Sequence, residues 1–120
     1  MITAIENIPS NVVAFRATDE VTKENYENVV IPEVEKLIKE KGELNYVMVI
    51  DTSLSNFTGG AWLRDALLGI KKIGKWHKGA VVSDSEMAKT LTDIFDFLTP
   101  GDFKFFNRDR LNEALEWAAN

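Results

Sequence analysis

The sequence contains no cysteine and only one histidine, His77. The absence of cysteine excludes disulfides, thiolate metal sites and a cysteine nucleophile. With a single histidine and no acidic cluster at ligand spacing, we expect neither a metal ion nor any other cofactor. No signal-peptide pattern is present, and no apolar run is long enough to span a membrane. We therefore expect a cytoplasmic protein.

Positive charge is also scarce. The net charge of −5 argues against nonspecific nucleic-acid binding, which needs a basic surface. The 120 residues, 45% of them hydrophobic, predict one globular domain over residues 1–120. Residues 61–78 carry a local charge of +4, so the remainder carries −9. A basic amphipathic helix on an acidic body is typical of membrane or partner docking, although a solvated helix face has the same composition.

The segment 58–76 is expected to be an amphipathic helix with a wide apolar face. Thr58 is a suitable N-cap, and four glycines lower helix stability, by up to about 1 kcal/mol each at interior positions. The segment is therefore either a movable lid over a hydrophobic site or a core helix whose glycines allow close packing. The apolar side chains cover about 180° of the helix, against roughly 100° for a common surface helix. They are Trp62, Leu63, Ala66, Leu67, Ile70, Ile73 and Trp76.

Hydrophobic periodicity predicts alternating strands and helices. Pro32 predicts a kink near Val29–Val30, or two consecutive short helices, and Gly42 is a natural helix stop. The apolar run 44–50 is typical of a strand that is buried on both faces. The predicted strands are 2–6, 12–18, 44–50, 79–83 and 103–106, and the predicted helices are 22–41, 58–76, 85–98 and 111–118.

This order, β-β-α-β-α-β-α-β-α, predicts an α/β fold with a mixed, mostly parallel five-stranded sheet. Only the first strand is expected to run antiparallel. Right-handed crossovers combined with sequential strand order predict helices mainly on one face. The other face would then need the N-terminal hairpin, a loop or another subunit as cover, so we also expect a homodimer.

Three stretches together resemble a known family. NVVAFRATDEVTKENYENVVIPEVEKLI, YVMVID and WLRDALLGIKKIGKWHKGAVVSD are similar to the SpoIIAA-like bacterial proteins of the STAS superfamily. The resemblance rests on a Thr-x-x-x-Tyr helix start, a proline within that helix and an aspartate that ends the central strand. It implies a compact α/β protein without an assigned activity. The family's fold is also similar to CRAL-TRIO domains, which hold lipophilic ligands in a pocket closed by a mobile helix.

One motif departs from the superfamily. Anti-sigma-factor antagonists begin the helix after the central strand with Asp-Ser-Ser-Gly, which supplies a phosphorylated serine. Here the junction reads Asn56-Phe57-Thr58-Gly59-Gly60, so Thr58 is the only hydroxyl left at the helix start. A plain N-cap is the favoured interpretation of Thr58, with a phosphosite as the alternative.

Polar residues follow several of the predicted strands. In a parallel sheet these positions share one edge, where ligands of open α/β sheets usually bind. Helix capping explains most of them. Asp51 alone could be a general base or phosphoacceptor, but no lysine or second carboxylate accompanies it at a fixed spacing. We therefore predict that the chain is not an enzyme. The residues at this edge are Asp51, Thr52, Ser53, Thr58, Ser83, Asp84, Ser85 and Asn107.

Two functions are compatible with these features. The first is a binding module for a small lipophilic ligand, or for a membrane surface, with helix 58–76 as a mobile gate. The second is a protein-interaction or regulatory module that buries the same helix in a homodimer or against a partner. The predicted ligand site comprises Asp51, Phe57, Thr58, Trp62, Leu63, Leu67 and Ile70. The predicted membrane or partner surface comprises Arg64, Lys71, Lys72 and Lys75.

Overall fold

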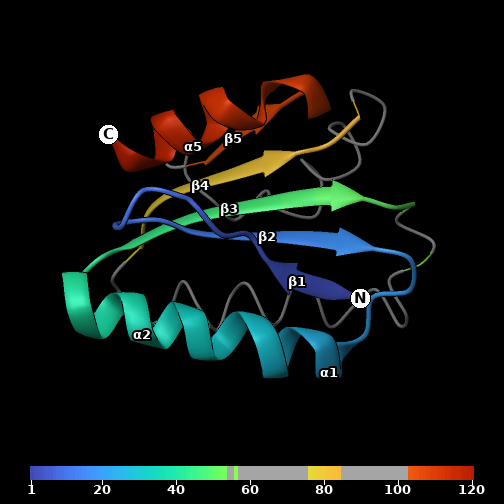
Figure 1. Ribbon diagram of the computed structural model, residues 1–120, viewed down its shortest axis with the longest axis horizontal. Helices are drawn as coiled ribbons and strands as arrows, with labels where there is room; N and C mark the ends of the chain where they lie inside the picture. The colour runs from blue at the N-terminus through green and yellow to red at the C-terminus, as the bar shows by residue number, and fades with distance from the viewer. Residues whose placement is uncertain (54–55, 57–75, 85–102) are drawn as a thin grey trace.

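Five strands form one sheet, and their order in the sheet is their order along the chain. They are β1 (Ile2–Ala4), β2 (Val13–Thr18), β3 (Leu44–Asp51), β4 (Trp76–Val82) and β5 (Phe103–Phe106). The computed structural model describes residues 1–53, 56, 76–84 and 103–120 (Figure 1). β1 pairs antiparallel with β2, and the other three pairings are parallel. The α/β fold and the sheet predicted from the sequence are confirmed.

β3 is the central strand, and its burial follows from its apolar sequence. Every residue from Leu44 to Ile50 is buried, and only Asp51 at the end is exposed. Met48 and Ile50 pack on one side of the sheet, while Val47 and Val49 pack on the other. A strand covered on both faces cannot alternate apolar and polar residues, which explains the continuous apolar run.

The first helical segment runs from Lys23 to Lys41 and changes geometry in the middle. It consists of α1 (Lys23–Asn25), a π-helical turn (Tyr26–Val30) and α2 (Ile31–Lys41). Pro32 has no N–H to donate to the turn before it, and the π-helical turn lies directly ahead of it. The interruption predicted near Val29–Val30 is therefore present.

Both ends of this segment are capped, and Gly42 ends it as the sequence predicts. At the start, Thr22 and Asn25 form a capping box in which each backbone N–H donates to the other side chain, at 3.1 Å. At the end, Gly42 adopts φ +76°, the left-handed conformation of a helix C-cap.

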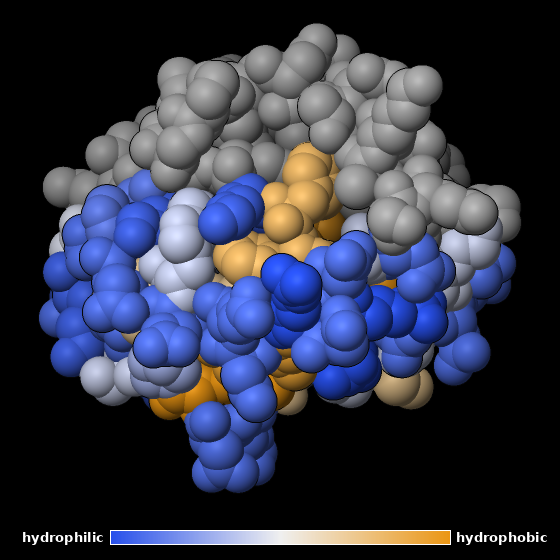
Figure 2. Space-filling model, turned by 90° about the horizontal axis from the view of Figure 1, so that it is seen from above, coloured by the Kyte–Doolittle hydropathy of each residue, from blue (hydrophilic) through white to orange (hydrophobic). Residues whose placement is uncertain are grey.

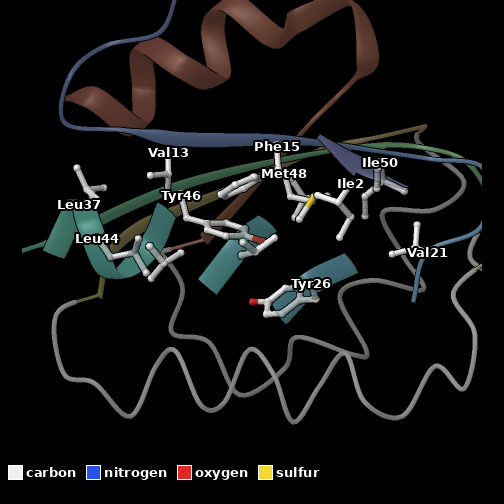
Figure 3. Close-up of a cluster of buried hydrophobic side chains, with 14 residues drawn as sticks. Ile2, Val13, Phe15, Val21, Tyr26, Leu37, Leu44, Tyr46, Met48 and Ile50 are labelled. Carbon is white, nitrogen blue, oxygen red and sulfur yellow. The ribbon is translucent and has the colours of Figure 1, made fainter. Parts of the chain in front are cut away.

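The helices described lie on both faces of the sheet. α1 and α2 lie on one side, and α5 (Leu111–Ala119) lies on the other (Figure 1). The core on the α2 side is rich in large side chains, including Phe15, Tyr46 and Met48 (Figure 3). On the α5 side, Ala114 and Ala118 of the helix pack against small and branched strand residues.

The prediction that the helices lie mainly on one face does not hold for α5. The rule of right-handed crossovers applies to a helix that connects two parallel strands. α5 follows the last strand and connects it to no other, so the rule does not fix its face. Together with Ile5 and Ile8 from the connection between β1 and β2, α5 covers the face for which the N-terminal hairpin, a loop or another subunit was expected. An uncovered sheet face therefore no longer supports the prediction of a homodimer.

The predicted helix 58–76 is wrong at its last residue, because Trp76 is the first residue of β4. β4 thus begins three residues before the predicted strand 79–83, and Trp76 pairs with Leu44 of β3. The remainder of this predicted helix and the helix predicted over 85–98 lie outside the described residues. Among the described residues, no helix is long and apolar enough to cross a membrane.

Candidate functional site

The carboxyl ends of the parallel strands meet at one edge of the sheet. The register pairs Thr18 at the end of β2 with Asp51 at the end of β3. It also pairs Val82 at the end of β4 with Phe106 at the end of β5. Hydrogen bonding continues one step further, since the Ser83 N–H donates to the Phe106 carbonyl at 3.0 Å. The residues that follow these strands are therefore held at one edge, as the sequence predicts.

Four charged side chains cross this edge, and we refer to Arg16, Asp51, Arg108 and Asp84 as the rim ladder. Arg108 lies between the two carboxylates, with Nη2 3.1 Å from Asp51 Oδ1 and Nε 3.2 Å from Asp84 Oδ1. Arg16 Nη1 approaches the other Asp51 oxygen at 3.7 Å. Between 40% and 54% of each side chain is exposed, so the pairs remain hydrated and each contributes about 1 kcal/mol or less.

The rim ladder changes the interpretation of Asp51. The Asp51 carboxylate, predicted to belong to the ligand site, is held between two arginines from different parts of the chain. A carboxylate placed in this way is poorly available as a general base, because a substrate proton would compete with a guanidinium group beside each of its oxygens. The observed role of Asp51 is to join β2 and β3 to the segment that follows β5.

Arg108 is the member of the ladder that the sequence analysis missed. It begins a short 3₁₀ turn, Arg108–Arg110, which the Arg110 N–H closes by donating to the Asn107 carbonyl at 2.9 Å. The only available signal was its position, one residue after the predicted edge residue Asn107. Its partners are Asp51 at the end of β3 and Asp84, two residues after β4. The contact therefore depends on the parallel register of the strands.

Other polar residues at this edge stabilise the local loops. The Thr52 hydroxyl donates to the Asp19 carbonyl at 2.9 Å, and the Asn56 amide donates to the Thr52 hydroxyl oxygen at 2.7 Å. The Ser83 hydroxyl donates to the Asp84 carbonyl at 3.3 Å. These bonds stabilise loops and not helix starts, and Asn107 makes no side-chain bond to the 3₁₀ turn that follows it, so the capping interpretation does not hold for these described residues.

A pocket of about 210 Å³ opens beside the ladder, where β5 leads into α5. Lys104 lies within it, with Nζ 5.2 Å from the centre of the Phe106 ring. Phe106 in turn lies 6.0 Å, centre to centre, from Trp117 of α5. The pocket, which we call the β5–α5 pocket, thus combines aromatic surface with charged and polar groups. Its lining residues are Ser83, Lys104, Phe105, Phe106, Asn107, Arg110 and Glu113.

The surface on the α5 side is mixed in character. Seen from above in Figure 2, its described residues are largely hydrophilic, with hydrophobic residues gathered between them. Several hydrophobic side chains on this side pack against the core but remain partly exposed, among them Phe106, Leu111, Leu115 and Trp117. A ligand at the β5–α5 pocket would therefore meet both apolar and charged surface.

Comparison with known proteins places this geometry in a family. The SpoIIAA-like family model matches residues 12–119, which include four of the five strands and α5. The chain belongs to the SpoIIAA-like family. Its fold is similar to that of an uncharacterized protein of the DUF3478 family from Shewanella loihica PV-4, described as having a SpoIIAA-like fold. That similarity has a TM-score of 0.63 and 27% sequence identity, over 98% of this chain and 93% of the other. No curated protein matches the chain.

The single histidine of this SpoIIAA-like chain lies at the opposite edge of the sheet. The side-chain amide nitrogen of the fully buried Asn45 donates to the Asn11 carbonyl at 2.9 Å. Asn45 Oδ1 is therefore left as an acceptor, and His77 Nδ1 donates to it at 2.7 Å. Asn11 donates to the Ala119 carbonyl at 2.8 Å. The network fastens the end of α5 to β3, and His77 itself lies in β4.

Two tyrosines of this SpoIIAA-like chain are buried. Tyr26 and Tyr46 belong to the core on the α2 side (Figure 3). Burial raises the pKa of both hydroxyls above the ordinary value of about 10. Since both rings are nearly inaccessible, they belong to the core and not to a catalytic site.

Of the predicted ligand-binding residues, only Asp51 lies in the described part of the chain. The structure therefore shows that Asp51 lies between two arginines, while the other site residues remain predictions. Within the described ranges, histidine and acidic side chains form no group of three that could hold a metal ion. The predicted residues outside the described ones are Phe57, Thr58, Trp62, Leu63, Leu67, Ile70, Arg64, Lys71, Lys72 and Lys75.

Proposed function

We propose that this SpoIIAA-like chain is a binding module for a small lipophilic ligand, held at the carboxyl edge of its sheet. The observation that carries the proposal is the β5–α5 pocket, which lies at this edge and presents Phe106 beside polar groups. Small-molecule sites are commonly apolar with a few polar groups at one end, and open α/β sheets bind ligands at this edge.

The chemistry of the edge supports binding without catalysis. Asp51 and Asp84 are engaged by Arg108. The Ser83 hydroxyl donates to a backbone carbonyl, and His77 belongs to the opposite edge. Among the described residues, the site therefore lacks a nucleophile in contact with a base, the arrangement that covalent catalysis requires.

The size of the pocket limits what it can hold. Its volume of about 210 Å³ lies below the range of roughly 300–1,000 Å³ for drug-sized ligand sites. It suits one end of an acyl-like chain, for which each buried methylene contributes about 0.8 kcal/mol. The proposed gate, residues 58–75, lies outside the described residues. The basic residues proposed to face a membrane also lie outside them. The expected similarity to CRAL-TRIO folds points to the same ligand class.

Native mass spectrometry of freshly purified protein tests the proposal, because it reports oligomeric state and retained ligand together. We expect a monomer that carries, or takes up, one fatty-acid-like molecule. A titration with fatty acids gives a second readout, since Trp117 lies against Phe106 and its emission should change as the pocket fills. A dimer without ligand, combined with unchanged emission, would favour the alternative, a protein-interaction module.

A further inference from the structure

We propose that the β5–α5 pocket recognises a carboxylate group at the end of an apolar chain, and that Lys104 and Arg110 provide the positive charge. This inference rests on the proposed function, since it names the chemical class of the ligand for the same site. The ligand is an amphiphilic acid, of which a medium-chain fatty acid is the simplest example.

The local charge supports an anion. The whole chain has a net charge of −5, yet the pocket contains two cations, Lys104 and Arg110, and one carboxylate, Glu113. The pocket also adjoins the first turn of α5, where the helix dipole favours negative charge. An acidic protein that concentrates positive charge in a hollow attracts anions there, although its overall field repels them.

Lys104 is the first recognising residue. Among the described residues, its ammonium group forms no ion pair with a carboxylate, and its Nζ lies over the Phe106 ring at 5.2 Å from the ring centre. A cation held over an aromatic ring keeps its charge available to an incoming anion. The Phe106 ring also offers apolar surface to the ligand's chain. Lys104 and Phe106 together can therefore contact both the carboxylate and the apolar chain of an amphiphile.

Arg110 is the second recognising residue. Its Nη1 lies 3.7 Å from Glu113 Oε2, a looser contact than the pairs of 3.1 and 3.2 Å that Arg108 makes. More than half of each of these two side chains, Arg110 and Glu113, is exposed. A guanidinium group has five donors, and a loose pair leaves several of them free for a bidentate bond to a ligand carboxylate.

Polar groups at the inner end complete the site. Ser83 is only 2% exposed and lines the pocket together with Asn107. The Ser83 hydroxyl donates its proton to the Asp84 carbonyl, so its own oxygen still has acceptor capacity for a bridging water. A carboxylate at the two cations, with its chain along Phe106, uses both the charged and the aromatic parts of the lining.

The test compares sodium octanoate with 1-octanol, which has the same chain length without the charge, in an amide-shift NMR titration of the full chain. We expect octanoate to shift the amides of Ser83, Phe106, Asn107 and Glu113 and to bind about tenfold more tightly than octanol. Lys104→Gln and Arg110→Gln should each weaken octanoate binding about five- to tenfold and leave octanol binding unchanged. Lys39→Gln, an exposed change on α2, is the matched control and should alter neither.

Equal binding of octanoate and octanol, unaffected by the two variants, would overturn the acid-recognition inference and leave the lipophilic module intact. Binding of neither compound would overturn both. Vesicles of anionic phospholipid provide a third arm. A chain that pellets with the vesicles but shows no octanoate shifts at the pocket would assign the anion recognition to a membrane surface, and this outcome would also overturn the inference.

Discussion

Arg108 Nη2 lies 3.1 Å from Asp51 Oδ1, and through its Nε the same guanidinium group also holds Asp84. The segment after β5 is thereby joined to the carboxyl ends of β3 and β4. A single side chain thus fixes the position of the 3₁₀ turn that leads into α5 and borders the β5–α5 pocket.

Replacement of Arg108 should loosen this edge. Arg108→Gln leaves Asp51 and Asp84 without their shared cation, and we expect the free energy of unfolding to fall by about 1 kcal/mol or less, since the pairs are partly exposed. The loss should shrink at high salt, where exposed pairs are screened. Urea unfolding at two salt concentrations measures it, with Lys39→Gln, an exposed change on α2, as the control. A loss that does not depend on salt would contradict an electrostatic role.

The two tyrosines predict how stability depends on alkaline pH. Because burial raises the folded-state pKa of Tyr26 and Tyr46, the unfolded chain releases these protons first. Their contribution is fully present below the unfolded value of about pH 10 and is lost as the pH rises further. The sequence contains only these two tyrosines, so tyrosinate absorbance reports them alone.

We therefore expect tyrosinate absorbance to appear together with loss of the fold, in one transition above about pH 10. In Tyr46→Phe, the decline of stability with alkaline pH should be shallower. Tyrosinate that forms near pH 10 while the circular dichroism stays native would show that the hydroxyls are accessible.

Asn45 predicts the strength of the opposite edge. Asn45→Ala removes the donor to the Asn11 carbonyl and the acceptor for His77, both of which belong to the fully buried Asn45 side chain. We expect the free energy of unfolding to fall by about 2 kcal/mol. Asn112→Ala on the exposed side of α5 is the control and should change it by less than about 0.5 kcal/mol. Equal effects of the two changes would remove the structural role of the network.

Gly42 gives a prediction about backbone conformation alone. A Cβ at this position would meet no atom within 4 Å, but its φ of +76° strains other residues. Gly42→Ala should lower stability by about 1 kcal/mol, and Gly42→Asn by less, because asparagine tolerates the left-handed region better. Thermal unfolding of both variants measures the difference. An alanine variant as stable as the wild type would show that the end of α2 rearranges.

The elements that sequence reasoning predicted correctly are those fixed by local chemistry. The apolar run that ends at Asp51 gave the central strand, and Pro32 and Gly42 marked the interruption and the end of the first helical segment. These features depend on neighbours within a few residues of the chain. The sequential order of the strands was expected, and it is observed.

The features that were missed depend on contacts between distant residues. Arg108 meets Asp51 only because the strands pair in parallel register. β4 begins at Trp76, and its first residues are held by a bond from His77 to Asn45 and by a bond from Lys78 Nζ to the Trp117 carbonyl at 3.1 Å. No local pattern in the sequence encodes such pairs.

The most direct test of the proposed ligand site is an isotope-filtered NOE measurement on the full chain with sodium octanoate. We predict NOEs from the ligand methylenes to the ring protons of Phe106 and from the methylene next to the carboxylate to the side chain of Lys104, because these groups line one pocket. Octanoate that binds without NOEs to either residue, or that fails to bind, would contradict a ligand site between β5 and α5.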